Sequence, residues 1–346
     1  MRLDEFAAVY LPQVGASLVD LLQQSDASLG ALYGMMQYHH GWVDAELRPV
    51  ENNPGKRLRP FLCLLCCQAA GGEPTQALPA ASALELVHSF SLVHDDIEDG
   101  SRMRRGRPAV WDVWGQAQAI NVGDALFALA HQSVLGLASG GVSIDRTVSA
   151  AQALDRACLA LCEGQFLDMS FERRTDIDLP QYLRMIRLKT AALLAASAQI
   201  GAIVAVEDRA VIAQMHSFGE HLGLAFQIQD DLLGIWGEED ITGKSALTDL
   251  RDKKKTLPVI HAMARDGHPA DARRLTSLFN QAGPLGEKEC SEALAILERA
   301  GSKAYAEAMA AHYLQLALDC LSQIALREPD VQALAGLARS LLSRRA

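Results

Sequence analysis

The chain is organised around the stretch HDDIEDGSRMRRGRP at residues 94–108, which closes an apolar run that begins near Leu78. Four acidic residues fall within five positions, and four arginines follow within eight. On a helix, Asp95 and Asp99 lie one turn apart on the same face. Carboxylates this close repel each other, and beside apolar sequence they are costly unless cations lie between them.

Two interpretations of this stretch follow from its residue types. Mg²⁺ prefers hard oxygen ligands and commonly combines one or two carboxylates with waters and substrate phosphates. The arginines that follow could then bind phosphate oxygens in a bidentate manner. The alternative is a solvated acidic helix end followed by a basic loop.

Length and composition favour a helical protein. The chain has 346 residues, of which 49% are hydrophobic, so it can bury a substantial core. Only 5% are aromatic, while alanine and leucine abound, and this favours close-packed helices over sheets. No strand pattern, short repeat or low-complexity linker stands out. We therefore expect an all-α fold.

Charge and hydropathy restrict the partners and the environment. With 32 basic against 42 acidic residues the net charge is −10, which opposes binding to nucleic acid. No apolar run reaches the ~18 residues of a membrane span, and the N-terminus MRLDEFAAVYLPQ lacks the pattern of a signal peptide. Seven cysteines in mostly apolar helical contexts suit a reducing compartment and core packing. We expect a soluble cytoplasmic protein.

Apolar periodicity predicts helices along the whole chain. An Asn-Asn-Pro-Gly break at residues 52–55 separates two amphipathic helices within residues 1–50 from the helix that follows GKRLRP at 55–60. Further helices are predicted over residues 77–99, 111–138, 145–172, 179–206, 211–236 and 270–346.

Basic side chains mark a possible anion site before the first aspartates. Lys56 and Arg59 are three residues apart, so at a helix start they point the same way, and the free N–H groups there add positive charge. This pattern indicates a diphosphate cradle or a basic helix end in water. His88 precedes Asp95 by seven residues and shares its face, so it is either a substrate contact or a structural core histidine.

The second half of the chain repeats the first pattern. Residues 211–236 form an apolar helix that ends in Gln227, Asp230 and Asp231, and a polar loop follows with Lys244 and three consecutive lysines at 253–255. Lys189 lies in an almost wholly apolar run and needs an anionic partner or a route to water. Phosphate capture and a buried salt bridge both satisfy that need.

In this order the motifs resemble the trans-isoprenyl diphosphate synthases, the head-to-tail polyprenyl synthetase family, over roughly residues 45–345. The resemblance rests on GKRLRP at 55–60, DDIED at 95–99 with Arg104-Arg105 after it, GQFLD at 164–168, Lys189-Thr190, FQIQDD at 226–231, and TGK at 242–244 with Lys254 beyond. It implies a single domain over residues 1–346, a large helical bundle around a central apolar cavity with the two aspartate motifs facing each other across its mouth. It also implies a homodimer, for which the stretch 111–138 is a candidate interface.

The resemblance further implies that isopentenyl diphosphate is condensed with an allylic diphosphate. Asp95, Asp99 and Asp230 would bind Mg²⁺, expected as three ions with the allylic diphosphate, and Asp96 and Asp231 would be supporting carboxylates. The allylic diphosphate would be contacted by Arg104, Lys189, Lys244 and Lys254. Isopentenyl diphosphate would be held by Lys56, Arg59, His88 and Arg105. Thr190 and Gln227 would face the reacting carbons.

The second aspartate motif departs from the family pattern. It reads DDLLG, with Gly234 where the fullest pattern has a third aspartate. Activity is expected to survive because Asp230 keeps the metal-binding position. The gap leaves a non-catalytic partner subunit as an alternative, and a class I terpene cyclase is another, because cyclases also use aspartate-rich metal sites on helices.

Product length is expected to depend on the residues below Asp95. A helix rises ~1.5 Å per residue, so Phe90 lies about 7 Å back along the axis and Val87 about 12 Å. In the family a bulky residue five or four positions before the first aspartate resembles a floor that stops chain growth. Phe90 with the small Ser91 resembles the geranylgeranyl (C20) type, and farnesyl (C15) or C25 products remain alternatives.

Overall fold

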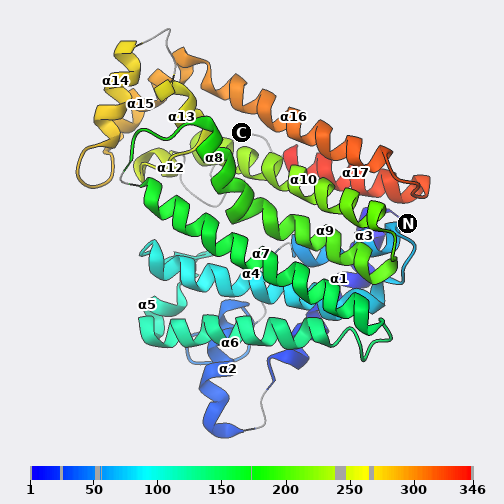
Figure 1. Ribbon diagram of the computed structural model, residues 1–346. Coiled ribbons are helices and arrows are strands. Elements are labelled where there is room, and N and C mark those ends of the chain that lie inside the picture. Colours follow the sequence, from blue (N-terminus) through cyan, green and yellow to red (C-terminus); the bar gives the residue numbers. More distant parts are fainter. Residues whose placement is uncertain are drawn as a thin grey trace. The chain divides into compact units, whose positions relative to one another are not determined.

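The computed structural model describes residues 2–23, 26–50, 55, 57–172, 174–237, 247–264 and 269–343, and these are almost entirely helical (Figure 1). The all-α prediction is confirmed. Two compact units make up the chain. Unit 1 comprises Met1–Arg156, Ala196–Met215 and Leu326–Ala333, and unit 2 comprises Ala157–Ala195, His216–Ala325 and Leu334–Ala346. The single domain with a central cavity stays a prediction.

The helices and strands follow the predicted order. Those within unit 1 are α1 (Leu3–Leu21), η1 (Ala27–Leu29), α2 (Gly30–His39), α3 (Leu58–Ala69), η2 (Pro74–Ala77), α4 (Leu78–Glu98), β1 (Met103–Arg104), β2 (Arg107–Pro108), α5 (Val110–Trp114) and α6 (Gln116–Leu135). Those within unit 2 are α8 (Leu179–Ile186), η3 (Arg187–Ala191), α12 (Thr248–Arg251), α13 (Leu257–Ala264), α14 (Pro269–Phe279), α15 (Glu287–Ala300) and α16 (Ser302–Ser322). Residues of both units are found in α7 (Ile144–Phe171), α9 (Ala192–Ala205), α10 (Arg209–Trp236) and α17 (Glu328–Leu342).

Helix α4 is the core helix of unit 1. It packs beside α6 over much of its length (Figure 1), and it also contacts α1, α3 and α5. Its side chains Leu84, Leu86 and Val87 are fully buried. A helix surrounded in this way needs apolar residues on most of its sides, which explains why its sequence is apolar apart from a few positions such as Glu85 and His88. Its last turn carries the first aspartates to the edge of this core.

A short hairpin follows α4 and corrects the expectation that the chain has no strands. Met103 pairs with Pro108 and Arg104 with Arg107 in antiparallel register. The two residues between them, Arg105 and Gly106, both have positive φ angles, of 52° and 76°. Two such residues form the type I′ turn that suits the twist of a two-residue hairpin. Strands of two residues are too short to show an alternating pattern.

Small residues on α10 set the packing inside unit 2. A Cβ atom at Gly219 would lie 2.5 Å from the carbonyl oxygen of Leu194, and one at Gly223 would lie 2.5 Å from the Cα of Ala191. These distances are too short for any side chain, so α10 approaches the start of α9 backbone to backbone. Gln227 and Asp231 continue the same stripe at four-residue spacing, which directs them towards the segment that carries Lys189 and Thr190.

The apolar segment Leu179–Ala205 corrects one expectation from the sequence. By length and composition it could cross a membrane, and it is the one such segment found among the described residues; 67% of its most apolar window is buried inside the protein. It also differs from the continuous helix expected at 179–206, because Arg187–Ala191 form a π-helical turn. Burial of this kind is typical of a core helix.

No disulfide joins the seven cysteines, which all lie among the described residues, and all but one of them are buried. Core packing is therefore confirmed for six of the seven. Cys162 is the exception, since its side chain is exposed on α7.

Candidate active site

The first aspartate pair divides its carboxylates between the surface and the interior. Asp96 is only 1% exposed, and Arg104 donates to it from Nε at 3.0 Å and from Nη2 at 2.5 Å. Burial raises the pKa of Asp96, and the Arg104 hydrogen bond and charge oppose that rise. Asp95 is half-buried and Asp99, the last residue of the motif, is exposed. Asp95 and Asp99 therefore remain accessible at this end of α4, as does the exposed Glu98.

The hairpin positions the two arginines predicted to bind diphosphates. Arg104 lies on β1, and its Nη2 is 3.6 Å from the Asp95 carboxylate as well as bonded to Asp96. Arg105 occupies the turn and is exposed. Its guanidinium lies beside Gly55, where an added Cβ would be 3.6 Å from Nη1. Both arginines therefore come from one short hairpin, and Arg104 in it contacts the aspartates.

Glu85 is a buried carboxylate near several of the basic residues, and the sequence did not single it out as a site residue. It is 5% exposed on α4. Burial raises its pKa, and the charges of Arg59, Arg105 and Arg57 oppose that rise. A buried carboxylate whose charge is favoured by three nearby guanidinium groups offsets part of their mutual repulsion. The signal in the sequence was the spacing, because Glu85, His88 and Asp95 share one face of α4.

The residues predicted to bind isopentenyl diphosphate interact electrostatically with Glu85 or with one another. Burial lowers the pKa of Arg59 to about 10, and its buried Nε has no hydrogen-bond partner among the described residues. Burial and the neighbouring arginines lower the pKa of His88 well below its ordinary value, so the imidazole is neutral at pH 7. Lys56 lies outside the described residues. Arg59, His88 and Arg105 thus form one cluster in unit 1.

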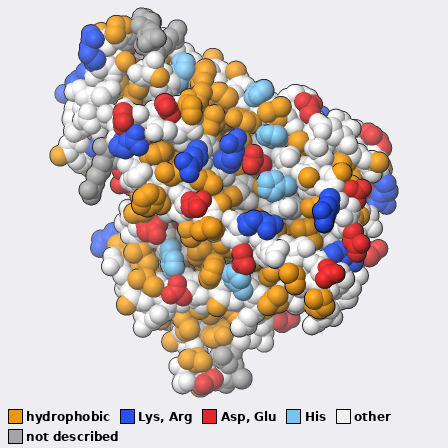
Figure 2. Space-filling view, viewed as in Figure 1, with side chains coloured by type: hydrophobic (Ala, Val, Ile, Leu, Met, Phe, Trp, Pro, Cys, Tyr) orange, Lys and Arg blue, Asp and Glu red, His pale blue; other side chains and the backbone are white. Residues whose placement is uncertain are grey.

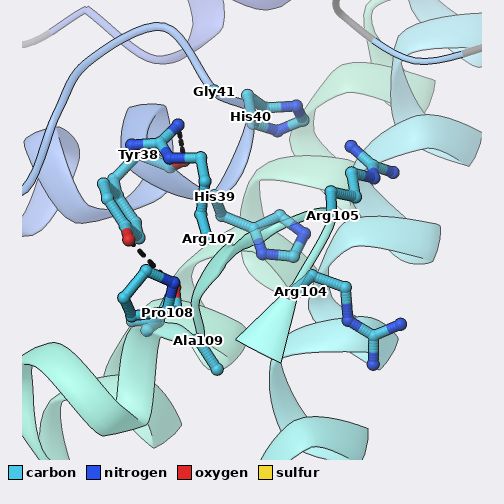
Figure 3. Close-up of a pocket in the computed structure, with 10 residues that line it drawn as sticks. Tyr38, His39, His40, Gly41, Arg104, Arg105, Arg107, Pro108 and Ala109 are labelled. Carbon is cyan, nitrogen blue, oxygen red and sulfur yellow. Dashed lines mark hydrogen bonds between the residues drawn. The ribbon is translucent and has the colours of Figure 1, made fainter. Parts of the chain in front are cut away.

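Arg105 of this cluster also lines a cavity of about 210 Å³ (Figure 3). It is lined by Tyr38, His39, His40, Gly41, Arg104, Arg105, Arg107, Pro108, Ala109 and Val110. Arg107 is structural, because its guanidinium lies 4.1 Å from the Tyr38 ring centroid and donates to the Val43 carbonyl at 2.6 Å. Arg104 and Arg105 extend away from this group in Figure 3.

The two histidines of the cavity were also missed from the sequence. His39 and His40 are both buried, and the Nε2 atom of each has no hydrogen-bond partner in the described part of the chain. Burial lowers the pKa of His40 to about 3, with the charges of Arg57 and Arg105 adding to the effect. Both imidazoles are therefore neutral lining groups at physiological pH.

The predicted chain-length residues all lie on α4. Phe90 is 7% exposed and packs against Phe127 of α6, with ring centroids 5.0 Å apart. Val87 is fully buried. The Ser91 hydroxyl donates to the His88 carbonyl at 2.9 Å, so the small residue is tied to its own helix. The bulky ring directed towards α6 is thus Phe90.

In unit 2, the π-helical turn presents Lys189 to an acidic partner. Its Nζ lies 2.5 Å from the Asp168 carboxylate. A Cβ atom at Gly164 would be 2.6 Å from the Lys189 Cα, so only glycine permits this approach of α7. Gly164 and Asp168 are one turn apart, which explains the spacing in GQFLD. π-turns are frequent at functional sites because they redirect a side chain.

A chain of hydrogen bonds connects the other predicted residues of unit 2. Thr190 donates from its hydroxyl to Gln227 Oε1 at 2.7 Å, and Gln227 Nε2 donates to Asp231 at 3.0 Å. Asp231 also accepts from the Tyr182 hydroxyl at 2.7 Å and from the Leu257 N–H at 2.9 Å. This network fixes the amide orientation of Gln227 and therefore where its oxygen lies.

The second aspartate pair is divided in the same way as the first. Asp231 is buried, and burial raises its pKa to about 7 despite three hydrogen bonds that favour the charged form. Asp230 is exposed. Lys254 Nζ lies 3.7 Å from Asp249, and Lys244 lies outside the described residues. The accessible carboxylate of this pair is Asp230.

The donor chemistry fits divalent magnesium. Among the described residues no three His, Cys, Asp or Glu side chains converge to hold an ion by themselves. Mg²⁺ seldom uses such an all-protein cage and commonly takes one or two carboxylates together with substrate phosphates. Asp95 and Asp99, one turn apart at the end of α4, provide that kind of partial ligand set.

The chain is similar to known proteins over most of its length. The family model of polyprenyl synthetase matches residues 40–297. The chain is 40% identical over 94% of its length to a (2E,6E)-farnesyl diphosphate synthase of Mycobacterium tuberculosis, covering 90% of that protein. It is also 40% identical to a geranylgeranyl diphosphate synthase of the same species, over 88% of this chain and 85% of the relative.

A solved structure shares the fold. The polyprenyl synthase of Caulobacter crescentus CB15, determined with calcium and isoprenyl diphosphate, superposes with a TM-score of 0.82 at 30% identity, covering 100% of this chain and 98% of the other. The family match spans well over half of the chain, and both curated relatives are covered over most of their length. The chain therefore belongs to the polyprenyl synthetase family, the trans-isoprenyl diphosphate synthases, and is a prenyltransferase.

Proposed function

We propose that the chain condenses isopentenyl diphosphate with an allylic diphosphate, head to tail, and releases geranylgeranyl diphosphate (C20) as its main product. The observation that carries this proposal is the presence of two charged sites on α4. The cradle around Glu85 and His88 is cationic, whereas Asp95 and Asp99 suit a metal-bound diphosphate. His88 and Asp95 are about 10 Å apart along the axis. Two diphosphates need two such sites, and a cyclase has only one diphosphate to hold.

The allylic diphosphate is assigned to the aspartates and their neighbouring cations. Asp95, Asp99 and Asp230 would hold Mg²⁺, as three ions, and the calcium and isoprenyl diphosphate bound by the Caulobacter relative support a divalent metal with a diphosphate ligand. When bound, Mg²⁺ stabilises the negative charge that develops on the departing diphosphate. Cationic support would come from Arg104, Lys189 and Lys254, and from Lys244 of the sequence motif TGK.

The isopentenyl partner is assigned to the arginine cradle. Arg59, Arg105 and His88, with Lys56 from the sequence, would bind its diphosphate and so fix its double bond relative to the allylic carbon. The Thr190 and Gln227 oxygens offer weak dipoles to the carbocation formed when the allylic C–O bond breaks. An apolar surrounding protects that cation from water. The proton lost after the new C–C bond forms would pass to the departing diphosphate.

The assay follows from the two-substrate proposal. The full chain is incubated with Mg²⁺, labelled isopentenyl diphosphate and, in separate reactions, the C5, C10 and C15 allylic diphosphates. We expect labelled products of up to 20 carbons. Diphosphate release to a hydrocarbon without isopentenyl diphosphate would indicate the cyclase alternative, and absence of turnover would indicate a non-catalytic subunit. Product lengths of C15 or C25 would replace the C20 assignment and keep the reaction.

Chain length is assigned to Phe90. Its ring contacts Phe127 and it lies five residues before Asp95, so replacing it by alanine removes bulk below the aspartates. Phe90→Ala is expected to shift the products to longer chains, measured by chromatography of the dephosphorylated alcohols. Phe279→Ala, which removes an equally buried ring from α14, is the matched control and should leave the distribution unchanged. An unaltered profile for Phe90→Ala rejects Phe90 as the floor.

We also propose a cytoplasmic homodimer. Exposed large apolar side chains recur on α6 at Ile120, Phe127 and Leu135 and continue at Ile144 and Val148 on the first part of α7. Ile120 and Phe127 are seven residues apart and therefore share a face. Exposed apolar surface of this kind commonly marks a protein interface. The expected interface within residues 111–138 thus remains the candidate.

A further inference from the structure

The position of Gly234 is filled by another residue's carboxylate. Gly234 follows Asp230 by four residues on α10, so the two share one face of the helix, one turn apart. A Cβ atom built at Gly234 would overlap Oδ2 of Asp249 and would lie 2.5 Å from its Cγ. The Asp249 side chain, which comes from α12, therefore occupies the space that a side chain at position 234 would take.

We propose that Asp249 supplies the outer carboxylate that the second aspartate motif lacks at Gly234. This inference rests on the proposed function, because it concerns the metal-dependent diphosphate site of the same reaction. Asp249 is a positioning residue in this proposal: it acts beside Asp230 in support of the bound metal and diphosphate and does not contact the reacting carbons.

The alternative carboxylate at this end of α10 is already engaged. Asp231 accepts hydrogen bonds from Tyr182, Gln227 and the Leu257 backbone. Its oxygens are therefore occupied by structural hydrogen bonds. Asp249 differs in that its side chain is 13% exposed and lies at 3.7 Å from the Lys254 ammonium. Lys254 is one of the cations assigned to the allylic diphosphate. Asp249 thus contacts that cation and also lies against the Gly234 position of α10.

The local backbone explains how α12 reaches this position. Leu247, directly before α12, has a positive φ of 66°, which turns the chain sharply. Leu250, the residue after Asp249 in α12, is fully buried in the cluster formed with α13, α14 and α15. This anchor fixes α12, so Asp249 is held against Gly234 by packing. Asp249 can therefore take this position only because residue 234 has no side chain.

The test transfers the carboxylate from position 249 on α12 to position 234 on α10. Four variants of the full chain are compared with the parent: Asp249→Asn, Asp249→Ala, Gly234→Asp with Asp249→Ala, and Asp252→Asn. Binding of Mg²⁺ in the presence of inorganic diphosphate is measured by isothermal titration calorimetry, and product formation is assayed in parallel. Asp252 is exposed on the same segment and has no assigned role, which makes its variant the matched control.

Loss of a supporting carboxylate near a metal typically weakens binding about 10-fold to 100-fold, so Asp249→Asn and Asp249→Ala should weaken Mg²⁺ binding by about 10-fold. The double variant should recover to within about threefold of the parent, since its aspartate re-enters the same space. Asp252→Asn should bind Mg²⁺ as the parent does. A purely structural role for Asp249 would lower the melting temperature without this rescue of metal binding.

The outcomes separate this inference from the proposed function. If the parent forms labelled prenyl products and Asp249→Ala leaves Mg²⁺ affinity unchanged, the inference is wrong and the function stands. If the double variant binds Mg²⁺ no better than Asp249→Ala, the inference is likewise overturned. A parent chain that forms no prenyl product overturns the proposed function itself, whatever the variants bind.

Discussion

In each aspartate pair of this protein, one carboxylate reaches the surface and its neighbour is buried in a hydrogen-bond network. Asp95 and Asp230 reach the surface, whereas Asp96 is bonded to Arg104 and Asp231 to Tyr182, Gln227 and the Leu257 backbone. Neighbouring residues on a helix diverge by about 100°, so one member of each pair turns towards the packed side. The inward carboxylate then fixes the surroundings of the outward one.

The buried imidazole of His40 predicts a loss of stability in acid. Its pKa is lowered from an ordinary 6.5 to about 3 in the folded protein, chiefly by burial. Below pH 6.5 the imidazole of His40 binds a proton in the unfolded chain but not in the folded chain. The part of the free energy of unfolding that is present above pH 6.5 is therefore lost as the pH falls. At pH 5 this single group should reduce the free energy of unfolding by about 2 kcal/mol.

Urea unfolding of the parent and of His40→Phe at pH 7.5 and pH 5.0 checks this prediction. Phenylalanine keeps a ring that can stack on Trp42, as the imidazole does at 4.9 Å, and cannot be protonated. The parent should lose more stability than the variant between the two pH values, by about 2 kcal/mol. Equal losses would show that His40 is protonated without cost in the folded state.

Helix α10 determines the positions of the polar residues in the second site. Gly219 and Gly223 let it touch the start of α9, and this contact brings Gln227 within hydrogen-bond distance of Thr190. The π-helical turn at Arg187–Ala191 adds a second local adjustment, which turns Lys189 towards Asp168. The geometry of the site thus depends on backbone approach as much as on polar side chains.

Gly223→Ala is expected to disturb this contact. The added methyl would lie 2.5 Å from the Ala191 Cα, and overpacking against backbone typically costs about 1–3 kcal/mol. Turnover should fall as well, because Thr190 and Gln227 would separate. Chemical denaturation and the product assay measure both effects. Gly30→Ala is the control, since an added Cβ there meets nothing within 4 Å, and a similar loss in both variants would contradict the packing argument.

The elements were predictable where the apolar pattern is long. Helix α4 was expected over residues 77–99 and spans Leu78–Glu98, and the helix expected over residues 145–172 spans Ile144–Phe171. The hairpin at Met103–Pro108 escaped detection because each strand has two residues. The π turn escaped because a π-helical run of five residues leaves the apolar pattern almost unchanged.

The site was predictable in its residue types and less so in its contacts. The order of the motifs indicated which aspartates, arginines and lysines belong together. It did not indicate that Arg104 would bind Asp96, that Glu85 would lie among three arginines, or that Asp249 would lie against Gly234. Each of these depends on which face of a helix is packed or on a partner distant in sequence, and neither is encoded in local spacing.

At the scale of the whole molecule, the net charge and the distribution of side chains on the surface must be considered together. The chain carries a net charge of −10, and the face in Figure 2 shows acidic and basic side chains interspersed, without a continuous basic surface. An acidic protein that binds anionic substrates must therefore concentrate its cations locally, as in the cradle around Glu85. Hydrophobic side chains lie between the charges on the same face.

The proposed homodimer gives the last prediction. Ile120 and Leu135 are both exposed on α6, and burying them against a second copy would remove apolar surface from water at about 25 cal/mol per Å². Replacing both by glutamate places two charges where the partner would pack, and an uncompensated charge in an apolar interface is costly. Light scattering after size exclusion should give the parent twice the mass of one chain and the Ile120→Glu/Leu135→Glu variant the mass of a single chain.

Leu29→Glu changes an exposed leucine on η1, outside this face, and should leave the dimer intact. A parent of single-chain mass, or a double variant that still dimerises, would place the interface elsewhere or remove it.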